Sequence, residues 1–269
     1  MSKKRVQEQF GAHAAGYVAS PIHAKGASLA RLVALTQPQP HWLALDVATS
    51  AGHTALTFAP HVSHVVATDI TPQMLLLAGK LAGEQGVGDL SLGAADAEAL
   101  PFADRSFDLV TCRIAAHHFP DVGRFLAESA RVLRPDGILA VVDNIVPGSH
   151  LRGKKARRQR DAGRYVNAFE KLRDPSHHRC LSLDEWTRAF HEAGFTNVTQ
   201  ETAYKQMAFE PWAERMGVSA DNKVRLRAML LQAPEPAAEF LLPQGAGTNL
   251  SFRLTEAIIV GRKPSAARP

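Results

Sequence analysis

A short apolar run followed by small residues and a helical segment constrains the fold of this chain more than any other feature. The run is Leu43–Val47, and residues 48–52 are small enough for the backbone to bend sharply before a helix predicted over 54–59. A ligand can then approach the N–H groups at the start of that helix. A second strand-type run over 62–68 ends at Asp69. Because α/β nucleotide folds place the acceptor for ribose hydroxyls at the tip of the second strand, the pattern predicts a nucleotide-type cofactor site.

Strand and helix continue to alternate through the first half of the chain. Thr71 and Pro72 predict the N-cap and the first residue of a helix that runs through Leu81. Further strands are predicted over 90–92, 107–112 and 138–142, with a helix over 121–133 that a turn at 134–137 ends. Because the connections are short, this order indicates an α/β fold with a parallel sheet covered by helices on both faces.

The C-terminal half is less regular and contains two long inserts. A helix is predicted over 183–193, and strands are predicted over 198–203 and 251–260. The inserts, 147–180 and about 209–247, are too long for simple connections. In α/β proteins such inserts commonly cover the ligand crevice at the carboxyl ends of the strands.

Composition excludes several classes of protein. With 269 residues, 45% of them hydrophobic and 21% charged, the chain suits one globular α/β domain. No apolar run approaches the roughly 18–20 residues that a membrane span needs. The basic N-terminus is followed by polar residues and not by the apolar core of a secretory signal. Cys112 and Cys180 predict neither a disulfide scaffold nor a metal site, so we expect a cytoplasmic protein.

The net charge of +5 is placed unevenly along the chain. Asp161 is the single acid within 152–164, a segment that holds Arg152, Lys154, Lys155, Arg157, Arg158, Arg160 and Arg164. Such a segment can attract phosphate, an acidic lipid surface or an anionic substrate, or it can be a solvated helix face. Because it lacks interleaved aromatic residues and a nucleic-acid module, no nucleic-acid partner is expected.

Several motifs together resemble one known family. They are Asp46–Gly52, Asp69, Asp96–Glu98, Phe107–Val110, Leu133–Gly137, Tyr17–Gly26, Thr111–Phe119, Arg173–Arg179 and the paired last strands. In this order they resemble a class I S-adenosylmethionine-dependent methyltransferase of the type 11, UbiE-like group, and the resemblance covers nearly the whole chain. It implies a Rossmann-like, seven-stranded doubly wound sheet with an N-terminal helical cap and helical lid inserts.

The resemblance also implies a domain organisation. Residues 1–269 would form a single methyltransferase domain, with the cap over 1–37 and the cofactor-binding core over 41–147. A lid insert would follow over 148–181. The C-terminal part of the sheet would cover 182–263 and carry the second lid insert at about 209–247.

S-adenosylmethionine is the cofactor that the resemblance implies, with S-adenosylhomocysteine as its product. Backbone groups from Ala48 to Gly52 would hold the methionine part, and Asp46 would favour the cationic cofactor or order the turn. Asp69 would accept both ribose hydroxyls, Ile70 and Met74 would pack on the adenine, and Asp96 and Ala97 would meet its polar edge. The full set of expected cofactor-binding residues is Tyr17, His23, Asp46, Ala48, Thr49, Ser50, Gly52, Asp69, Ile70, Met74, Asp96, Ala97, Glu98, Arg113, Ala115 and His118.

The turn departs from the family pattern at two positions. Glycines are usual where this chain has Ala48 and Ser50. If the backbone needs a positive φ there, each non-glycine residue costs roughly 1 kcal/mol or more. If it does not, the Ser50 hydroxyl fills space or donates to the cofactor.

The acceptor site is less well defined by the sequence. His117 or His118 can remove a proton from a phenol, thiol or acidic carbon, because imidazole titrates near neutral pH; either can instead be a packing residue. The expected substrate-binding residues are Asp143, Asn144, Arg173, His177, His178 and Arg179, and the favoured acceptor is a small, anionic or enolate-like organic molecule. Adjacent histidine pairs seldom aim both rings at one ion, so no metal is expected.

Three alternative functions stay open. A nicotinamide dinucleotide fold also uses an acid at the second strand, but the G-x-G-x-x-G fingerprint is absent. Ser50 and the basic segment are compatible with a cofactor-binding protein that has lost methyl transfer and acts through partners. The basic segment alone would suit an RNA- or phosphate-binding protein. The acceptor atom and the oligomeric state are not determined by the sequence.

Overall fold

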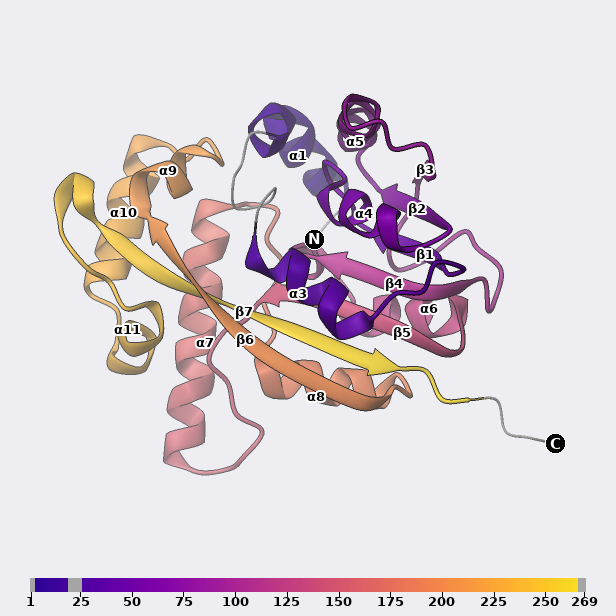
Figure 1. Ribbon diagram of the computed structural model, residues 1–269. Coiled ribbons are helices and arrows are strands. Elements are labelled where there is room, and N and C mark those ends of the chain that lie inside the picture. Colours follow the sequence, from indigo (N-terminus) through magenta and orange to yellow (C-terminus); the bar gives the residue numbers. More distant parts are fainter. Residues whose placement is uncertain (1–2, 19–25, 266–269) are drawn as a thin grey trace.

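The fold is a seven-stranded sheet with helices on both faces, seen in a computed structural model (Figure 1). The structure describes residues 3–18 and 26–265, and of 12–18 it describes the backbone alone. The strands are β1 (Leu43–Val47), β2 (His64–Asp69), β3 (Leu90–Ala94), β4 (Phe107–Arg113), β5 (Leu133–Asn144), β6 (Thr196–Ala208) and β7 (Ser251–Arg262). Their order across the sheet is β3-β2-β1-β4-β5-β7-β6. The predicted doubly wound α/β architecture is therefore confirmed.

The helices divide between the two faces of the sheet and the two inserts. The described helices are α1 (Lys3–Val18), α3 (Ala27–Thr36), α4 (His53–Phe58), α5 (Pro72–Glu84), α6 (Val122–Val132), α7 (Lys154–Arg173), α8 (Leu183–Glu192), α9 (Phe209–Glu214), α10 (Ala220–Leu231) and α11 (Glu235–Leu241). Helices α3, α4 and α5 cover one face, and α6 and α8 cover the other. Within the described ranges no helix is both long and apolar enough to cross a membrane.

The sheet is mixed: its first five strands are parallel, as the short connections of the first half predicted, and the last two are antiparallel to each other. β1 to β5 are parallel, but β7 pairs antiparallel with β5 and with β6. The long insert before β7 allows that strand to return between β5 and β6, a placement that local sequence patterns do not encode. β5 also begins at Leu133, so the segment 134–137, predicted as a turn, belongs to the strand.

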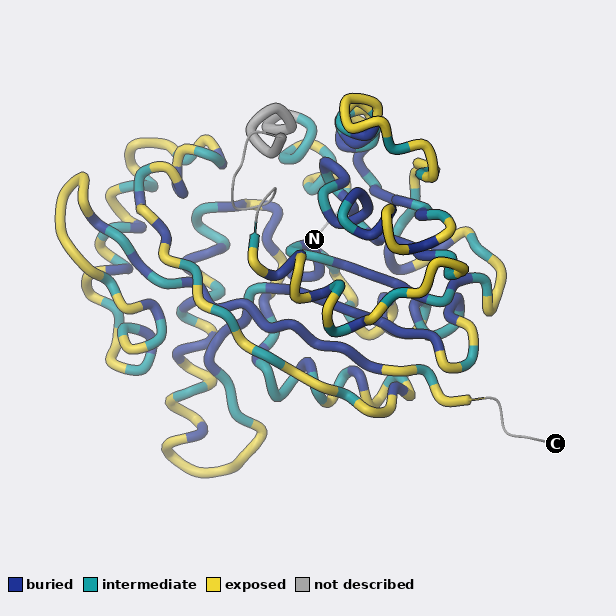
Figure 2. Tube along the Cα trace, in the orientation of Figure 1, coloured by how far each residue is buried: buried dark blue, intermediate teal, exposed yellow. Residues whose placement is uncertain are grey.

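Two cores flank the sheet because successive side chains of each strand point to opposite faces. In β1, Leu45 and Val47 pack toward α6 and α8, while Ala44 packs in the core beneath α3 and α4. A third core lies in the inserts, where Phe169 of α7 stacks on Trp212 of α9 with ring centroids 5.0 Å apart. In Figure 2 buried residues continue from the sheet into this region. The inserts are thus packed structure and not loose loops, which fixes them over one end of the sheet.

Candidate active site

The turn after β1 folds into the cradle that the sequence predicted. Ala48, Ser50 and Gly52 have φ values of 54°, 52° and 86°. The Thr49 N–H donates to the Thr68 carbonyl at 2.8 Å, and the Ser50 N–H donates to Asp69 Oδ2 at 2.9 Å. Both non-glycine residues therefore adopt the left-handed conformation, at a cost of about 1 kcal/mol each.

Asp46 orders this turn from behind. Its side chain is 1% exposed and accepts hydrogen bonds from Thr49 Oγ1 at 2.6 Å and from Thr111 Oγ1 at 2.7 Å. Burial raises the pKa of Asp46 to about 6, although both hydroxyls oppose this shift. Of the two roles expected for Asp46, the geometry fits the ordering of the turn, because its carboxylate does not line the cavity.

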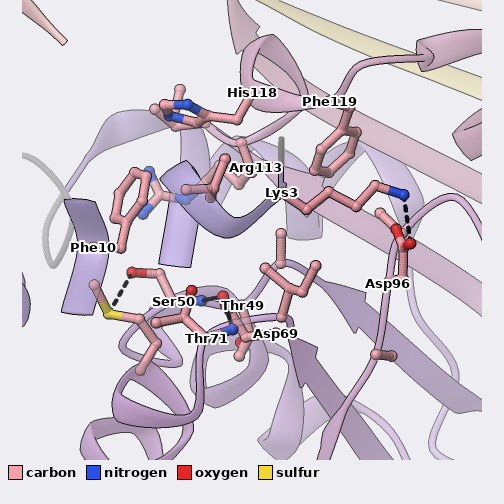
Figure 3. A pocket seen from close by; sticks show the side chains of 18 of the residues that line it. Lys3, Phe10, Thr49, Ser50, Asp69, Thr71, Asp96, Arg113, His118 and Phe119 are labelled. Carbon is pink, nitrogen blue, oxygen red and sulfur yellow. Dashed lines mark hydrogen bonds and ion pairs between the residues drawn. The ribbon is translucent and has the colours of Figure 1, made fainter. Parts of the chain in front are cut away.

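Asp69 lies at the tip of β2 and lines the cavity beside the turn (Figure 3). Its Oδ1 accepts from the Thr71 N–H at 2.8 Å, and burial raises its pKa although the N–H groups of Thr71 and Ser50 oppose the shift. Each carboxylate oxygen can accept more than one hydrogen bond, so Asp69 retains capacity for a ligand. The tip of β2 therefore offers an acceptor suited to hydroxyl groups.

A second acidic group closes the far side of the same cavity. Asp96 and Glu98 follow β3, and Lys3 of α1 reaches across to both, with Nζ 2.5 Å from Asp96 Oδ2 and 2.7 Å from Glu98 Oε2. Figure 3 shows the Lys3 side chain spanning the cavity toward Asp96. Three acids thus surround the cavity, and the helix α1 supplies one wall.

The end of β4 forms the boundary between two cavities. Ile114, just after β4, has a φ of 54°, which is rare for a β-branched residue, and its N–H donates to the Val142 carbonyl at 2.7 Å. Phe10, Ile114 and His118 line both the cofactor-side cavity and a second, polar cavity. Phe10 and His118 meet edge to face with ring centroids 4.9 Å apart. These three residues, which we call the neck, belong to the walls of both cavities.

The second cavity is built from elements far apart in the sequence. Asn144 comes from the end of β5, Glu170 and Arg173 from the last turns of α7, and Lys205 from β6. Lys205 forms an ion pair with the buried Glu256, and burial lowers the pKa of Lys205 although Glu256 opposes the shift. Arg173 lies over the Trp212 ring, 4.7 Å from its centroid. The cavity therefore combines charged groups with aromatic and aliphatic walls.

His117 is held in place by Asp143. The imidazole Nδ1 is 2.6 Å from Asp143 Oδ1, and Asp143 Oδ2 accepts from the His117 N–H at 2.7 Å. Burial lowers the pKa of His117, but the charge and hydrogen bond of Asp143 outweigh burial, so its pKa lies above the usual value. Because Nδ1 is bound to Asp143, Nε2 is the ring nitrogen that can exchange a proton with a molecule in the second cavity.

His118 has the opposite electrostatic setting. Burial and the neighbouring His117 lower the pKa of His118 to about 4. Its Nδ1 lies 3.2 Å from the Ser176 carbonyl oxygen, which fixes the ring at the neck. His118 is therefore neutral near pH 7, and His117 is the better placed of the two to exchange protons.

Most of the residues expected at the cofactor site line one cavity. Those that do are Ala48, Thr49, Ser50, Asp69, Ile70, Met74, Asp96, Ala97, Glu98, Arg113, Ala115 and His118. Gly52 does not line it but provides the left-handed turn into α4, where an added Cβ would lie 3.0 Å from Ala78 Cβ. His23 and the Tyr17 side chain lie outside the described residues.

The residues expected at the acceptor site are more dispersed. Asn144, Arg173 and His177 line the second cavity, whereas Asp143 lies behind it against His117. His178 and Arg179 are exposed and lie elsewhere: the Arg179 guanidinium pairs with Glu185. In the turn through 176–179 the first two residues are buried and the last two are exposed, so His177 and His178 separate.

The sequence predicted a helical cap at the N-terminus, but not the particular residues of α1 and β6 that line the cavities. Lys3, Val6 and Phe10 line the first cavity at spacings of three and four, a helical face that the sequence does contain. Lys205 and Met207 reach the second cavity from alternate positions of β6. No local signal marks those two residues, because only the pairing with β7 brings them there.

The chain is similar to methyltransferases in sequence and structure. Residues 45–141 match a family described as a methyltransferase domain. The methyltransferase YcgJ of Bacillus subtilis is 33% identical over 94% of this chain and 97% of its own length. Its crystal structure covers 89% of this chain and 99% of the YcgJ chain, with a TM-score of 0.81.

Two further relatives match this chain over different shares of its length. A crystal structure of a Bacillus halodurans protein described as a methyltransferase is 34% identical, with a TM-score of 0.82, and covers 89% of this chain and all of its own. A demethylmenaquinone methyltransferase of Deinococcus radiodurans is 41% identical over 40% of this chain and 46% of its own length. The family match, the identity to YcgJ over nearly the whole chain and the shared fold lead to one conclusion: the chain belongs to the class I methyltransferase family.

Proposed function

We propose that the chain transfers a methyl group from S-adenosylmethionine to a small organic acceptor in the second cavity. The observation that carries the proposal is the pair of adjacent cavities that share Phe10, Ile114 and His118 as lining residues. One cavity suits a nucleoside-type cofactor, and the other is polar and separate. A transfer reaction needs two such sites in contact, because the reacting atoms must approach within about 3–3.5 Å.

The residues of the first cavity fit S-adenosylmethionine. Backbone groups of 48–51 would hold its methionine part, and Asp69 would accept the ribose hydroxyls. Ile70 and Met74 would pack on the adenine, with Asp96 and Ala97 at its polar edge. When bound, the cofactor supplies an electrophilic methyl group on a positively charged sulfur.

The second cavity provides groups that can bind and deprotonate the acceptor. Asp143 holds His117 so that Nε2 can take a proton from a hydroxyl, thiol or acidic carbon. Arg173 and Lys205 supply positive charge beside apolar walls of Met207 and Trp212. These groups favour a small acceptor that is anionic or becomes anionic on losing its proton. The quinone of the demethylmenaquinone methyltransferase is not carried over, because that match covers only 40% of this chain and 46% of the other protein.

Calorimetric titration with S-adenosylhomocysteine tests the cofactor site. Asp69→Asn should weaken binding at least tenfold, because it removes a buried charge that faces the ligand. Asp89→Asn, at an exposed acid just before β3, is the matched control and should bind like the natural chain. Failure of the natural chain to bind at high micromolar ligand, or equal affinity in the two variants, would overturn the assignment.

A mass-spectrometric screen tests the transfer itself. Cell extract incubated with methyl-labelled S-adenosylmethionine and the protein should yield a labelled small molecule that the Asp69→Asn variant does not produce. Cofactor binding without any labelled product would support the alternative of a binding protein that has lost methyl transfer.

A further inference from the structure

The beginning of α7 and the loop before it form an exposed basic projection away from both cavities. It consists of Leu151, Arg152, Lys154, Lys155, Arg157 and Arg158, which we call the basic tip, and each of these residues is exposed. In Figure 1 this end of α7 extends beyond the sheet and beyond α8, and Figure 2 shows it as mostly exposed. The tip is therefore available to a large flat partner.

The positive charge of the tip is only partly neutralised within the chain. Arg158 pairs with Glu235, and Arg157 lies 3.9 Å from Asp161. For Arg152, Lys154 and Lys155, no acid of residues 3–18 or 26–265 lies within ion-pair distance. Cations at a helix N-terminus oppose the helix dipole. The charges thus do not stabilise α7, and an external anionic surface would compensate them.

An exposed apolar side chain stands beside these cations. Leu151 is 62% exposed at the turn of the projecting loop, immediately before Arg152. Residues 147–160 contain no phenylalanine, tyrosine or tryptophan on which a nucleic-acid base would stack. Phospholipid bilayers, in contrast, offer anionic headgroups directly above an apolar layer.

We propose that the basic tip docks the protein on the surface of an anionic phospholipid bilayer. Leu151 enters the boundary between headgroups and acyl chains, and Arg152, Lys154 and Lys155 lie against lipid phosphates. The 20-residue α7 carries Glu170 and Arg173 at its other end, in the second cavity. Because a helix of that length spans about 30 Å, the docked end of α7 lies about 30 Å along the helix from the end that lines the second cavity.

Co-sedimentation of the full chain with vesicles tests the proposal. The natural chain should bind vesicles made of equal parts of phosphatidylglycerol and phosphatidylcholine, and it should not bind vesicles of pure phosphatidylcholine. Binding to the anionic vesicles should weaken at high salt. The triple variant Arg152→Gln, Lys154→Gln, Lys155→Gln should lower the partition coefficient roughly a hundredfold. Leu151→Ser should lower it about fivefold.

The control variant removes the same charge elsewhere. Lys80→Gln, Arg124→Gln, Arg225→Gln neutralises three exposed cations on other helices and should bind vesicles like the natural chain. S-adenosylhomocysteine titration of all variants shows that they are folded, and it is independent of lipid binding. Equal loss in the two triple variants, or equal binding to both kinds of vesicle, would overturn the proposal. Binding of a 20-nucleotide RNA through the tip, without vesicle binding, would replace it with a nucleic-acid site.

Discussion

Individual backbone angles decide how the cofactor turn of this protein can tolerate its unusual residues. Ala48 and Ser50 stand where the family resemblance implies glycines, and both hold left-handed φ values of 54° and 52°. Hydrogen bonds from the Thr49 and Ser50 N–H groups fix the turn against β2. The strain is therefore maintained by the sheet, which is typical of residues at functional sites.

Ser50→Gly should raise the free energy of unfolding by about 0.5–1 kcal/mol, because glycine adopts the left-handed conformation without strain. Urea denaturation followed by circular dichroism measures the change. Ala228→Gly, at an exposed position in the helix α10, should lower the free energy of unfolding by about 1 kcal/mol. Destabilisation by Ser50→Gly would show that the hydroxyl contributes more than the backbone strain costs.

The paired His117 and Asp143 predict a specific pH dependence. Asp143 raises the pKa of His117, so the neutral base forms only as the pH rises through that raised value. Asp143→Asn should move the rising limb of the pH–rate profile to lower pH. It should also reduce the maximal rate about a hundredfold, because asparagine can hold the wrong tautomer.

The measurement is a pH profile of labelled methyl transfer to the acceptor identified by the screen, together with an NMR titration of the imidazole. Asp184→Asn is a matched control, since Asp184 contacts the exposed His150 at 2.9 Å. A profile that does not move in Asp143→Asn would exclude His117 as the base.

Among the elements around the proposed cofactor site, α1 is the one whose position depends most on tertiary packing. It lies against α5, and Lys3, Val6 and Phe10 close the first cavity. The Lys3 ammonium contacts Asp96, the acid that the proposed function assigns to the adenine amine. Burial lowers the pKa of Lys3, but Asp96 and Glu98 outweigh it and raise the pKa overall.

Lys3→Met should therefore increase the affinity for S-adenosylhomocysteine by about two- to fivefold, because a partly exposed ion pair of modest strength no longer competes for Asp96. Calorimetry measures the affinity. Lys4→Met is the control, since the Lys4 side chain is 81% exposed and contacts Glu8. Weaker binding by Lys3→Met would mean that Lys3 contacts the ligand instead of competing with it.

Local patterns predicted the elements of the cofactor core better than those of the inserts. Thr71 and Pro72 do begin α5, and Asp121 caps α6 by accepting from the Arg124 N–H at 3.0 Å. β6 runs over Thr196–Ala208, much longer than the predicted 198–203, because its pairing with β7 extends it. Capping and apolar periodicity act within a few residues, whereas strand length in a hairpin depends on a partner far along the chain.

For the whole molecule, buried histidines link stability to pH in opposite directions. Burial and neighbouring His117 and His118 lower the pKa of His177 to about 2, and His118 titrates near 4. The unfolded chain therefore binds protons at these sites first as the pH falls below 6.5, which disfavours the folded state. His117 has the opposite effect, because its pKa is raised in the folded state. Its protonated form stabilises the folded state at low pH, and this contribution is lost as the pH rises through the raised pKa. The raised pKa of Asp46 disfavours the folded state at neutral pH, and this cost becomes smaller as the pH falls below about 6.

Because these contributions oppose one another, the test compares the free energy of unfolding of a variant with that of the natural chain at each pH. His177→Gln should gain stability relative to the natural chain as the pH falls from 6.5 toward 4, by up to about 1.4 kcal/mol per pH unit. Urea unfolding at pH 7, 6 and 5 measures it, with His41→Gln at an exposed position as control. A difference that does not change with pH would show that His177 binds its proton equally well in the folded and unfolded states, which contradicts a lowered pKa.

The sequence by itself predicted the residues around the first cavity, which the proposed function assigns to the cofactor. The turn at 48–52, Asp69 and Asp96 follow consecutive strands, and the carboxyl ends of parallel neighbours meet at one edge of the sheet. Three features were decided only by the tertiary structure. They are the left-handed φ angles of Ala48 and Ser50, the hydrogen bond between His117 and Asp143, and the second cavity. Those features depend on contacts between α1, α7 and β6, which lie far apart in the chain, and on burial that sets the pKa of each histidine.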